Sequence, residues 1–197
     1  MKYPHFYTQI PPIELYDPLS EFLGAFEEGH LSISYLDCVK LAGHSCPTVA
    51  GAYLMAREGL KALYPDTLPE RGSIKIEMQA QRTEKTTGVV ATILSFILGA
   101  GDTGGFKGLQ GNFSRDNLLF FDSDIPTEVT LTRLDTEESI RLTYNPSSIK
   151  PDANMVPLMG KCLNNSASKE EKENFRKLWQ ERIEKILLSE ESLITIS

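Results

Sequence analysis

The feature that most constrains the fold of this chain is a change in hydrophobic period along its length. Between residues 47 and 98, apolar residues recur mainly at helical spacing, with one alternating segment at 73–78. After residue 116, three short segments rich in strand-forming residues follow at 117–121, 128–134 and 139–144, separated by turn residues. This order of periods predicts an α+β fold with an antiparallel or mixed sheet flanked by helices. We expect the three later strands to form an antiparallel meander.

Start signals and apolar stripes predict the main helices. Pro47 suits the first turn of a helix that extends to about Leu63, because a first-turn residue needs no hydrogen-bonded N–H. A buried helix is predicted over 89–98, and Ser168 with Glu171 forms a capping box that begins a final amphipathic helix. We expect the stripe of that helix to dock on the core or on a second subunit. Shorter helices are predicted over 18–28 and over 155–163. We expect the helix 18–28 to pack on the core through its apolar face.

The size and charge of the chain limit its organisation and its partners. Its 197 residues suit one α+β core over 1–150, with a helical extension over 151–197. The net charge of −7 argues against nucleic acid and anionic membrane surfaces, which need a concentrated basic face. The apolar run at 89–100 is shorter than a membrane span. An N-terminus without an apolar export signal, together with three cysteines, predicts a cytoplasmic protein.

Two residues at the start of the helix 47–63 have side chains that can bind a metal. His44 and Cys46 flank Ser45 in the segment Gly43-His44-Ser45-Cys46-Pro47. A helix N-terminus favours a thiolate there, and imidazole with thiolate suits zinc or a similar transition metal. The alternative interpretation is structural, with Cys46 as a small buried residue and His44 as an ordinary turn residue. The other cysteines, Cys38 and Cys162, fit structural positions.

Three segments resemble the E-subunit family of formylmethanofuran dehydrogenase. They are Leu41-Ala42-Gly43-His44-Ser45-Cys46-Pro47 with the small-residue helix after it, Gly88-Val89-Val90-Ala91-Thr92-Ile93-Leu94, and Arg115-Asp116-Asn117-Leu118-Leu119-Phe120. The resemblance implies a core similar to the catalytic domain of glyceraldehyde-phosphate dehydrogenase, often as an intertwined homodimer. It also implies a metal site at His44 and Cys46. The chain is similar to a core-only member, because a helix stands where some members carry a zinc ribbon.

The chain departs from the family pattern at two positions. The family motif reads His-Gly-His-x-Cys-Pro and has a further cysteine before the second helix, whereas here these positions hold Ala42 and Thr87. His44 and Cys46 therefore remain as the expected metal ligands. His5 is a candidate additional ligand if the N-terminal segment folds across the site. The alternative for His5 is a solvated side chain.

The glycine-rich loop at 101–111 is a second candidate functional region. Its glycines would allow close backbone approach to a ligand, although it lacks a phosphate-binding motif. The candidate catalytic residues in this loop and just after it are Asp102, Lys107 and Arg115. Asp102 would act as a base, and Lys107 or Arg115 would bind a carboxylate or phosphate. The alternative is a mobile surface loop.

Together these features predict a metal-binding protein, with zinc or another divalent metal as cofactor and a coordination position open to a small molecule. An open zinc site suits hydrolysis or one-carbon chemistry. The first alternative is a non-catalytic accessory or metal-sensing homodimer. The second is a metal-free enzyme that uses Cys46 as nucleophile and His44 as base. The alternatives differ in whether the chain is an enzyme, and all stay open at this point.

Overall fold

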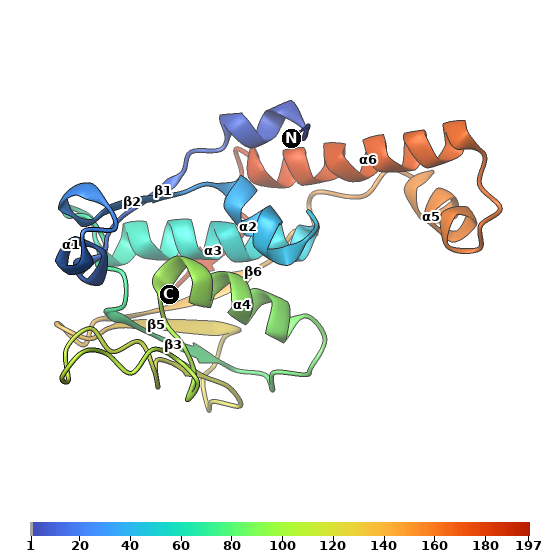
Figure 1. The fold of residues 1–197 in the computed structure, drawn as a ribbon. Helices are drawn as coiled ribbons and strands as arrows, with labels where there is room; N and C mark the ends of the chain where they lie inside the picture. The colour runs from blue at the N-terminus through green and yellow to red at the C-terminus, as the bar shows by residue number, and fades with distance from the viewer. Residues whose placement is uncertain (1) are drawn as a thin grey trace.

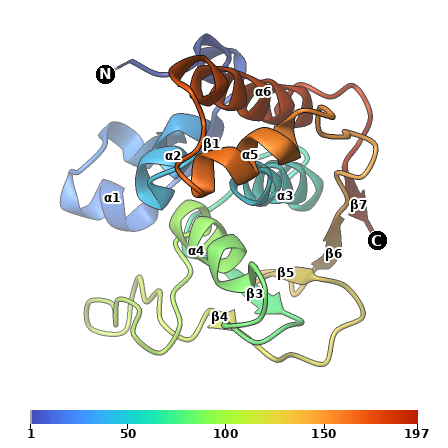
Figure 2. The same cartoon turned by 90° about the vertical axis from the view of Figure 1, so that its right-hand side faces the viewer.

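The computed structural model describes residues 2–197 and has the expected α+β architecture, with a mixed sheet covered on one face by helices (Figure 1). The main sheet has the strand order β4-β3-β5-β6-β7. Its strands are β3 (Ile74–Met78), β4 (Leu119–Phe120), β5 (Val129–Arg133), β6 (Ser139–Tyr144) and β7 (Ile194–Ile196). Helices α3 (Pro47–Leu63) and α4 (Thr87–Leu98) lie on this sheet. Over them lie α2 (Tyr35–Ala42), the N-terminal turn, which is a short 3-10 helix at His5–Gln9, and α6 (Lys169–Leu187) (Figures 1 and 2).

Helix α3 (Pro47–Leu63) is the centre of the core, as its sequence predicts. The residues at helical spacing that form its predicted apolar face are fully or almost fully buried; they are Val49, Ala52, Tyr53, Ala56, Leu60 and Leu63. Ala50, Gly51, Leu54 and Met55 are buried as well, because the sheet, α4 and α6 surround the helix, whereas Pro47 and Thr48 at its start are half-buried. Two glycines allow this close packing: a Cβ at Gly59 would approach Leu131, and one at Gly51 would overlap the ring of Tyr144.

The meander prediction is correct for two of its strands and wrong for the third. β5 and β6 are antiparallel neighbours, with Leu131 opposite Ile140. β4 instead pairs parallel with β3, on the far side from β5, and this two-residue strand lies at the sheet edge. The glycine-rich loop carries the chain across to this edge. β7, at the other edge, pairs with β6 and returns the C-terminal extension to the core.

The N-terminal segment forms a small hairpin that the sequence did not predict. β1 (Ile13–Tyr16) pairs antiparallel with β2 (His30–Ile33). Between them α1 (Pro18–Leu23) is shorter than predicted, because Gly24 adopts a left-handed conformation (φ +64°) and ends the helix. Its apolar face is not packed as predicted: Phe22 is 65% exposed and Leu23 is 61% exposed.

Two further helices frame the candidate site. α2 (Tyr35–Ala42) begins with a capping box between Ser34 and Asp37 and ends at Gly43. α4 (Thr87–Leu98) matches the predicted buried helix and packs against α3. The loop from Gly99 to Leu118 that follows has no regular helix or strand, as predicted.

The last two helices form an arm that projects from the body (Figure 1). α6 (Lys169–Leu187) begins at the predicted capping box, and its C-terminal half buries Ile183, Ile186 and Leu187 against the core. Its N-terminal half packs against α5 (Met155–Leu163) instead. Across residues 2–197, no helix combines the length and the apolar character that a membrane crossing requires.

Candidate metal site at the start of helix α3

Cys46 is the residue that caps the N-terminus of α3. Its backbone is extended, Pro47 takes the first helical position, and the Sγ atom accepts a hydrogen bond from the Val49 N–H at 3.5 Å. The thiol group therefore lies at the N-terminus of a long helix, the end toward which the backbone N–H groups point. Its side chain is partly exposed, so solvent or a metal can reach it.

His44 lies in the turn between α2 and α3 and is exposed. Gly43 adopts a left-handed conformation (φ +74°) that ends α2 and redirects the chain into this turn. The Nδ1 atom of His44 is 3.0 Å from the carbonyl oxygen of Ala42. When Nδ1 carries the proton and donates to this oxygen, Nε2 keeps its lone pair. This is the arrangement in which most metal-binding histidines are held.

Ser45, between the two candidate ligands, is anchored on both sides. Its hydroxyl group shares a hydrogen bond of 2.8 Å with the hydroxyl group of Tyr35 on α2, in a buried position. Its carbonyl oxygen accepts a hydrogen bond of 2.8 Å from Nε1 of Trp179 on α6. The tripeptide is therefore fixed to two helices besides its own. Sequence reasoning missed both partners, although the one tryptophan of the chain has a donor that needs a partner when it packs.

The N-terminal turn packs next to the candidate site, but the residue that it brings there is Tyr7 and not the predicted His5. The ring of Tyr7 packs edge-on against Tyr35 with centroids 5.2 Å apart, and its hydroxyl group donates to Gln180 at 3.1 Å. Burial raises the pKa values of Tyr7 and Tyr35, so both stay protonated at neutral pH. His5, in the same turn, is exposed.

A cavity of about 320 Å³ adjoins the start of α3. Its lining includes Pro47 and Thr48 from α3, Thr87 from α4 and Tyr144 from the end of β6. Thr87 is the position where the resembling family has a cysteine, so the structure brings that position close to the candidate site. Ala42, at the end of α2, is partly buried and packs against the core.

Tyr144 provides a buried polar atom at this cavity. Within residues 2–197, its hydroxyl group has no hydrogen-bond partner, although the atom is buried. Burial raises the pKa of Tyr144; Arg182 opposes this effect, and Cys46 and Glu128 add to it. A protonated hydroxyl group close to Cys46 therefore lacks an acceptor. Burying a hydroxyl group without an acceptor is costly.

The donor set at the site is small. In the part of the chain that the structure describes, no three His, Cys, Asp or Glu side chains come together in an arrangement able to hold a metal ion. His5 thus does not form such a group with His44 and Cys46. One imidazole and one thiol fit a metal that takes its remaining ligands from solvent, a small molecule or another chain, and they do not fit a closed four-ligand site.

The candidate catalytic residues of the glycine-rich loop are held in three separate ion pairs. Asp102 pairs with Arg82, Lys107 with Asp116 at 2.6 Å, and Arg115 with Asp17. The hydrogen bond from Arg82, together with the N–H of Gly104, lowers the pKa of Asp102, which makes it a weak base at neutral pH. Asp102 lines a groove of about 560 Å³ between α4 and the loop.

Comparison with known proteins identifies the family of this chain. No curated protein matches the chain. The family model described as "FmdE, Molybdenum formylmethanofuran dehydrogenase operon" matches residues 41–195, from the last turn of α2 to β7. This range contains His44, Cys46, the cavity at the start of α3 and the main sheet except the last residue of β7. The chain therefore belongs to the FmdE family.

Proposed function

We propose that this protein binds a transition metal, with zinc first, through Nε2 of His44 and Sγ of Cys46. The observation that carries the proposal is the hydrogen bond between Nδ1 of His44 and the Ala42 carbonyl, which leaves Nε2 available two residues before the thiol that caps α3. Borderline nitrogen and soft sulfur donors suit zinc. The anchoring of Ser45 supports it, because both ligands flank a fixed residue.

With two protein ligands, the remaining positions are open to a small molecule. Zinc in an open site supplies a Lewis acid for a carbonyl or carboxylate group. The role of the protein is then to orient the molecule in the adjoining cavity. The unpartnered hydroxyl group of Tyr144 would donate to an oxygen of that molecule, and Thr48 and Thr87 line the same cavity.

A non-catalytic accessory or metal-sensing role is the second candidate, and the projecting arm favours it. The side chains of Val156 (57% exposed) and Leu163 (74% exposed) on α5 are apolar and face solvent. We propose that a second copy of this chain covers them, so that the protein is a homodimer. A delivery or sensing role then predicts metal binding without turnover of small molecules.

The metal-free thiol enzyme is less well supported. Among residues 2–197, no hydrogen bond joins the ring of His44 to Sγ of Cys46: Nδ1 of His44 contacts the Ala42 carbonyl, and Sγ of Cys46 accepts from the Val49 N–H. A nucleophile and its base need a direct hydrogen bond and a third group that orients the base.

The test is metal analysis of untagged protein, comparing the wild type with His44→Ala and Cys46→Ser. We expect about one metal per chain, lost in both variants. Titration with Co²⁺ adds an optical readout, because a cobalt–thiolate bond has its own absorption. Cys162→Ser and His30→Ala are matched controls, since each removes a donor of the same type elsewhere. Metal content that is unchanged in Cys46→Ser, or zero in the wild type, would refute the proposal.

A further inference from the structure

Two arginines share one buried carboxylate between the N-terminal hairpin and the body of the molecule. Asp17 caps the N-terminus of α1, and its side chain is only 2% exposed. It accepts hydrogen bonds from the Ser20 N–H at 3.0 Å, from Nη1 of Arg71 at 3.0 Å and from Nη2 of Arg115. Burial alone would raise the pKa of Asp17, but these donors lower it. Asp17 is therefore ionised at neutral pH.

The donors of Arg71 are used by the protein. Besides Asp17, its guanidinium group donates to the carbonyl oxygens of Phe96 at 2.7 Å and Ile97 at 3.1 Å, in the last turn of α4. These carbonyl groups lack partners within the helix, so Arg71 completes the C-terminus of α4. Arg71 therefore has a structural role, linking α1 to α4 through Asp17.

Arg115 has donors to spare. Among residues 2–197, its side chain makes a single hydrogen bond, from Nη2 to Asp17. Its Nε and Nη1 atoms therefore have no acceptor in the protein. Its side chain is only 15% exposed, and it lies close enough to Arg71 for the two positive charges to repel. Two largely buried guanidinium groups thus share the one carboxylate of Asp17.

The other carboxylates near this pair are already engaged. Asp37 lines the same groove, but Ser34 and Lys40 hold it, the latter at 2.9 Å. Glu70 lines a smaller pocket on the far side of the arginines and accepts a hydrogen bond from Ser73. Neither forms an ion pair with Arg115. The hydroxyl group of Ser73 leaves the negative charge of Glu70 in place on the far side of the arginines, whereas on the groove side Asp17 is the carboxylate that pairs with Arg115.

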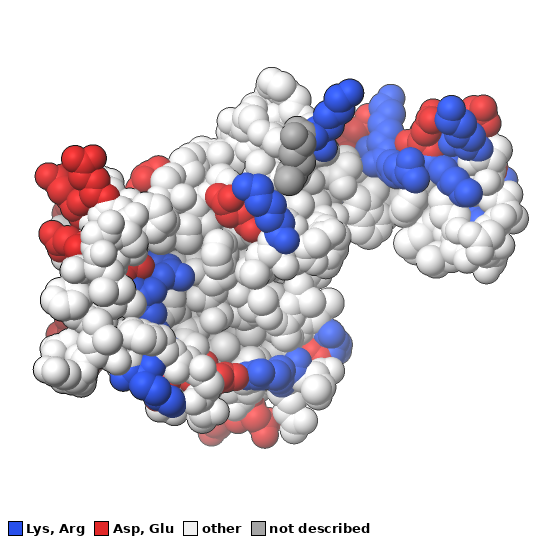
Figure 3. Space-filling view, in the orientation of Figure 1, with Lys and Arg blue, Asp and Glu red and all other residues white. Residues whose placement is uncertain are grey.

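The groove itself is about 510 Å³ and is mainly apolar above the arginines. This size suits a small organic molecule. Its larger apolar lining residues are Leu19, Leu23, Phe26, Leu31, Ile33 and Phe96. Leu23 and Phe26 are largely exposed on the hairpin side. In the space-filling view, basic atoms are visible within a hollow between the unit that carries α1 and the rest of the molecule (Figure 3).

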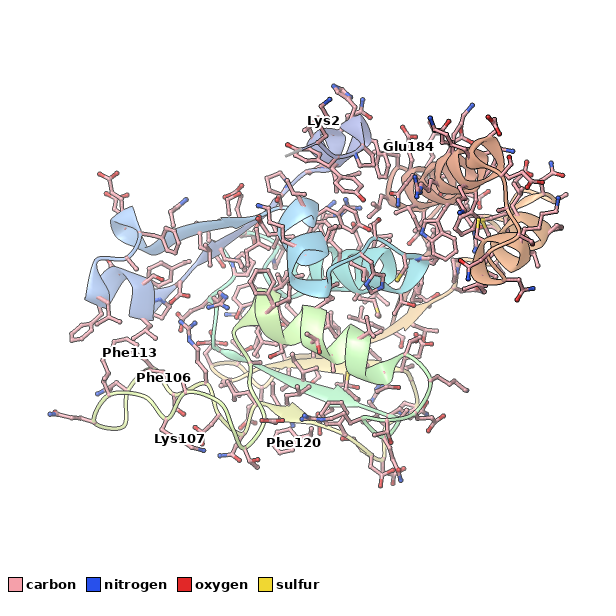
Figure 4. All side chains as sticks on the ribbon, turned by 45° about the vertical axis from the view of Figure 1, so that its right-hand side comes forward. Lys2, Phe106, Lys107, Phe113, Phe120 and Glu184 are labelled. Carbon is pink, nitrogen blue, oxygen red and sulfur yellow. The ribbon has the colours of Figure 1, made fainter. Side chains whose placement is uncertain are left out.

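An aromatic contact on the adjacent surface fixes the position of α1 over the loop. The rings of Phe22 on α1 and Phe113 on the loop lie 5.3 Å apart, and Figure 4 shows Phe113 beneath α1. The loop that carries Arg115 and the hairpin that carries Asp17 are thus joined twice. The groove is therefore a built feature of the fold.

We propose that this groove binds a small organic monoanion, a carboxylate with an apolar or aromatic body, with Arg115 as the residue that holds the carboxylate. Arg115 shares the one carboxylate of Asp17 with Arg71, so a bound carboxylate would add a second negative charge beside the two guanidinium groups, with the Nη1 donor of Arg115 free to hold one of its oxygens. The apolar walls take the body of the ligand, which removes Leu23 and Phe26 from water. This site is separate from His44 and Cys46.

The test is isothermal titration of untagged protein with 3-phenylpropanoate and octanoate, each compared with its neutral amide. We expect the carboxylates to bind at least about tenfold more tightly than the amides. Arg115→Gln should weaken carboxylate binding about tenfold or more, and it leaves Asp17 paired with Arg71. Phe26→Ser, at an exposed position, should weaken both carboxylates several-fold without affecting the ion pairs.

Two controls separate this site from others. Arg82→Gln removes an exposed arginine and should leave binding unchanged. Cys46→Ser should also leave it unchanged, so failure of the metal proposal and failure of this one give different results. Equal affinity for acid and amide, wild-type affinity in Arg115→Gln, or no binding up to about 10 mM would overturn the proposal. Tighter binding of phenyl phosphate than of 3-phenylpropanoate would overturn the assignment to a monoanion.

Discussion

The indole N–H of Trp179 donates a 2.8 Å hydrogen bond to the carbonyl oxygen of Ser45, a residue 134 positions earlier in the chain. This bond connects the arm to the turn that carries both candidate metal ligands. If His44 and Cys46 hold a metal as proposed, a change in α6 at Trp179 should therefore alter its binding.

Trp179→Phe tests this coupling, because it keeps an aromatic ring and removes the donor. We expect a loss of about 1 kcal/mol in the free energy of unfolding, since the Ser45 carbonyl loses its partner. Zinc affinity should fall about tenfold, as for other residues that orient metal ligands. Urea unfolding followed by circular dichroism and a zinc competition titration measure the two effects. Phe175→Leu, which alters a ring beside Trp179, is the control; equal effects in both variants would contradict the coupling.

Gly51→Ala tests the close packing of Tyr144 on α3. A Cβ at Gly51 would lie 2.3 Å from the ring of Tyr144, so the ring or the helix must move. We expect a destabilisation of about 1–3 kcal/mol. Gly160→Ala in α5 is the matched control, because a Cβ there meets nothing within 4 Å; this change should stabilise the protein by roughly 0.5–1 kcal/mol. Thermal and urea unfolding of both variants would show opposite signs, and the same sign would refute the packing argument.

The stability of the protein should depend on pH through Asp17. Its pKa in the folded state lies below the usual value of 3.8, so ionised Asp17 stabilises the fold above that pH. This stabilisation is lost as the pH falls through the folded-state pKa. Asp17→Asn should cost about 3 kcal/mol at neutral pH, because it leaves two largely buried guanidinium groups without a carboxylate.

The difference between wild type and Asp17→Asn should shrink as the pH approaches and passes below 3.8. Urea unfolding between neutral and acidic pH measures it. Glu84→Gln, in an exposed ion pair with Lys85, should change stability by less than about 0.5 kcal/mol and is the control. A difference for Asp17→Asn that stays constant over the pH range would contradict the linkage.

The three cysteines should differ in their reaction with iodoacetamide. Burial, with a smaller contribution from Asp37, raises the pKa of Cys38 to about 12, and Cys38 is fully buried. Cys38 should therefore stay unmodified in native protein, whereas the partly exposed Cys46 and Cys162 react. Zinc should protect Cys46 and leave Cys162 reactive. Peptide mass spectrometry of alkylated protein measures each site; modification of Cys38 at the rate of Cys162 would contradict the structure.

The proposed homodimer predicts that polar residues on α5 weaken association. Val156→Ser and Leu163→Ser change exposed side chains, so the fold of one chain should be unaffected. We expect sedimentation velocity to show a dimer for the wild type and a larger monomer fraction for the double variant. Leu188→Ser, at another exposed apolar position, is the control. A monomeric wild type, or an unchanged dimer in the double variant, would refute the proposed interface.

Local signals in the sequence determined the principal helices and the candidate metal ligands. Pro47 and the helical period identified α3, and the Ser168 and Glu171 capping box identified the start of α6, because such signals act within one or two turns. The pairing of β5 with β6 followed from two strands joined by a short turn. His44 and Cys46 were recognised because their chemistry and their position before a helix are local properties.

Only the tertiary structure decided which distant residues meet. The parallel pairing of β4 with β3 depends on the path of a long loop, and no periodicity encodes that path. The short α1 and its exposed apolar face follow from the left-handed Gly24 and from the docking of the hairpin. Arg115 was identified in the sequence as an anion-binding candidate, but its partner Asp17 lies 98 residues away. The contacts of Ser45 with Tyr35 and Trp179 likewise exist because packing brings separate helices together. The sequence thus determined local conformation and chemistry, whereas the neighbours of each site depend on long-range packing that local patterns do not specify.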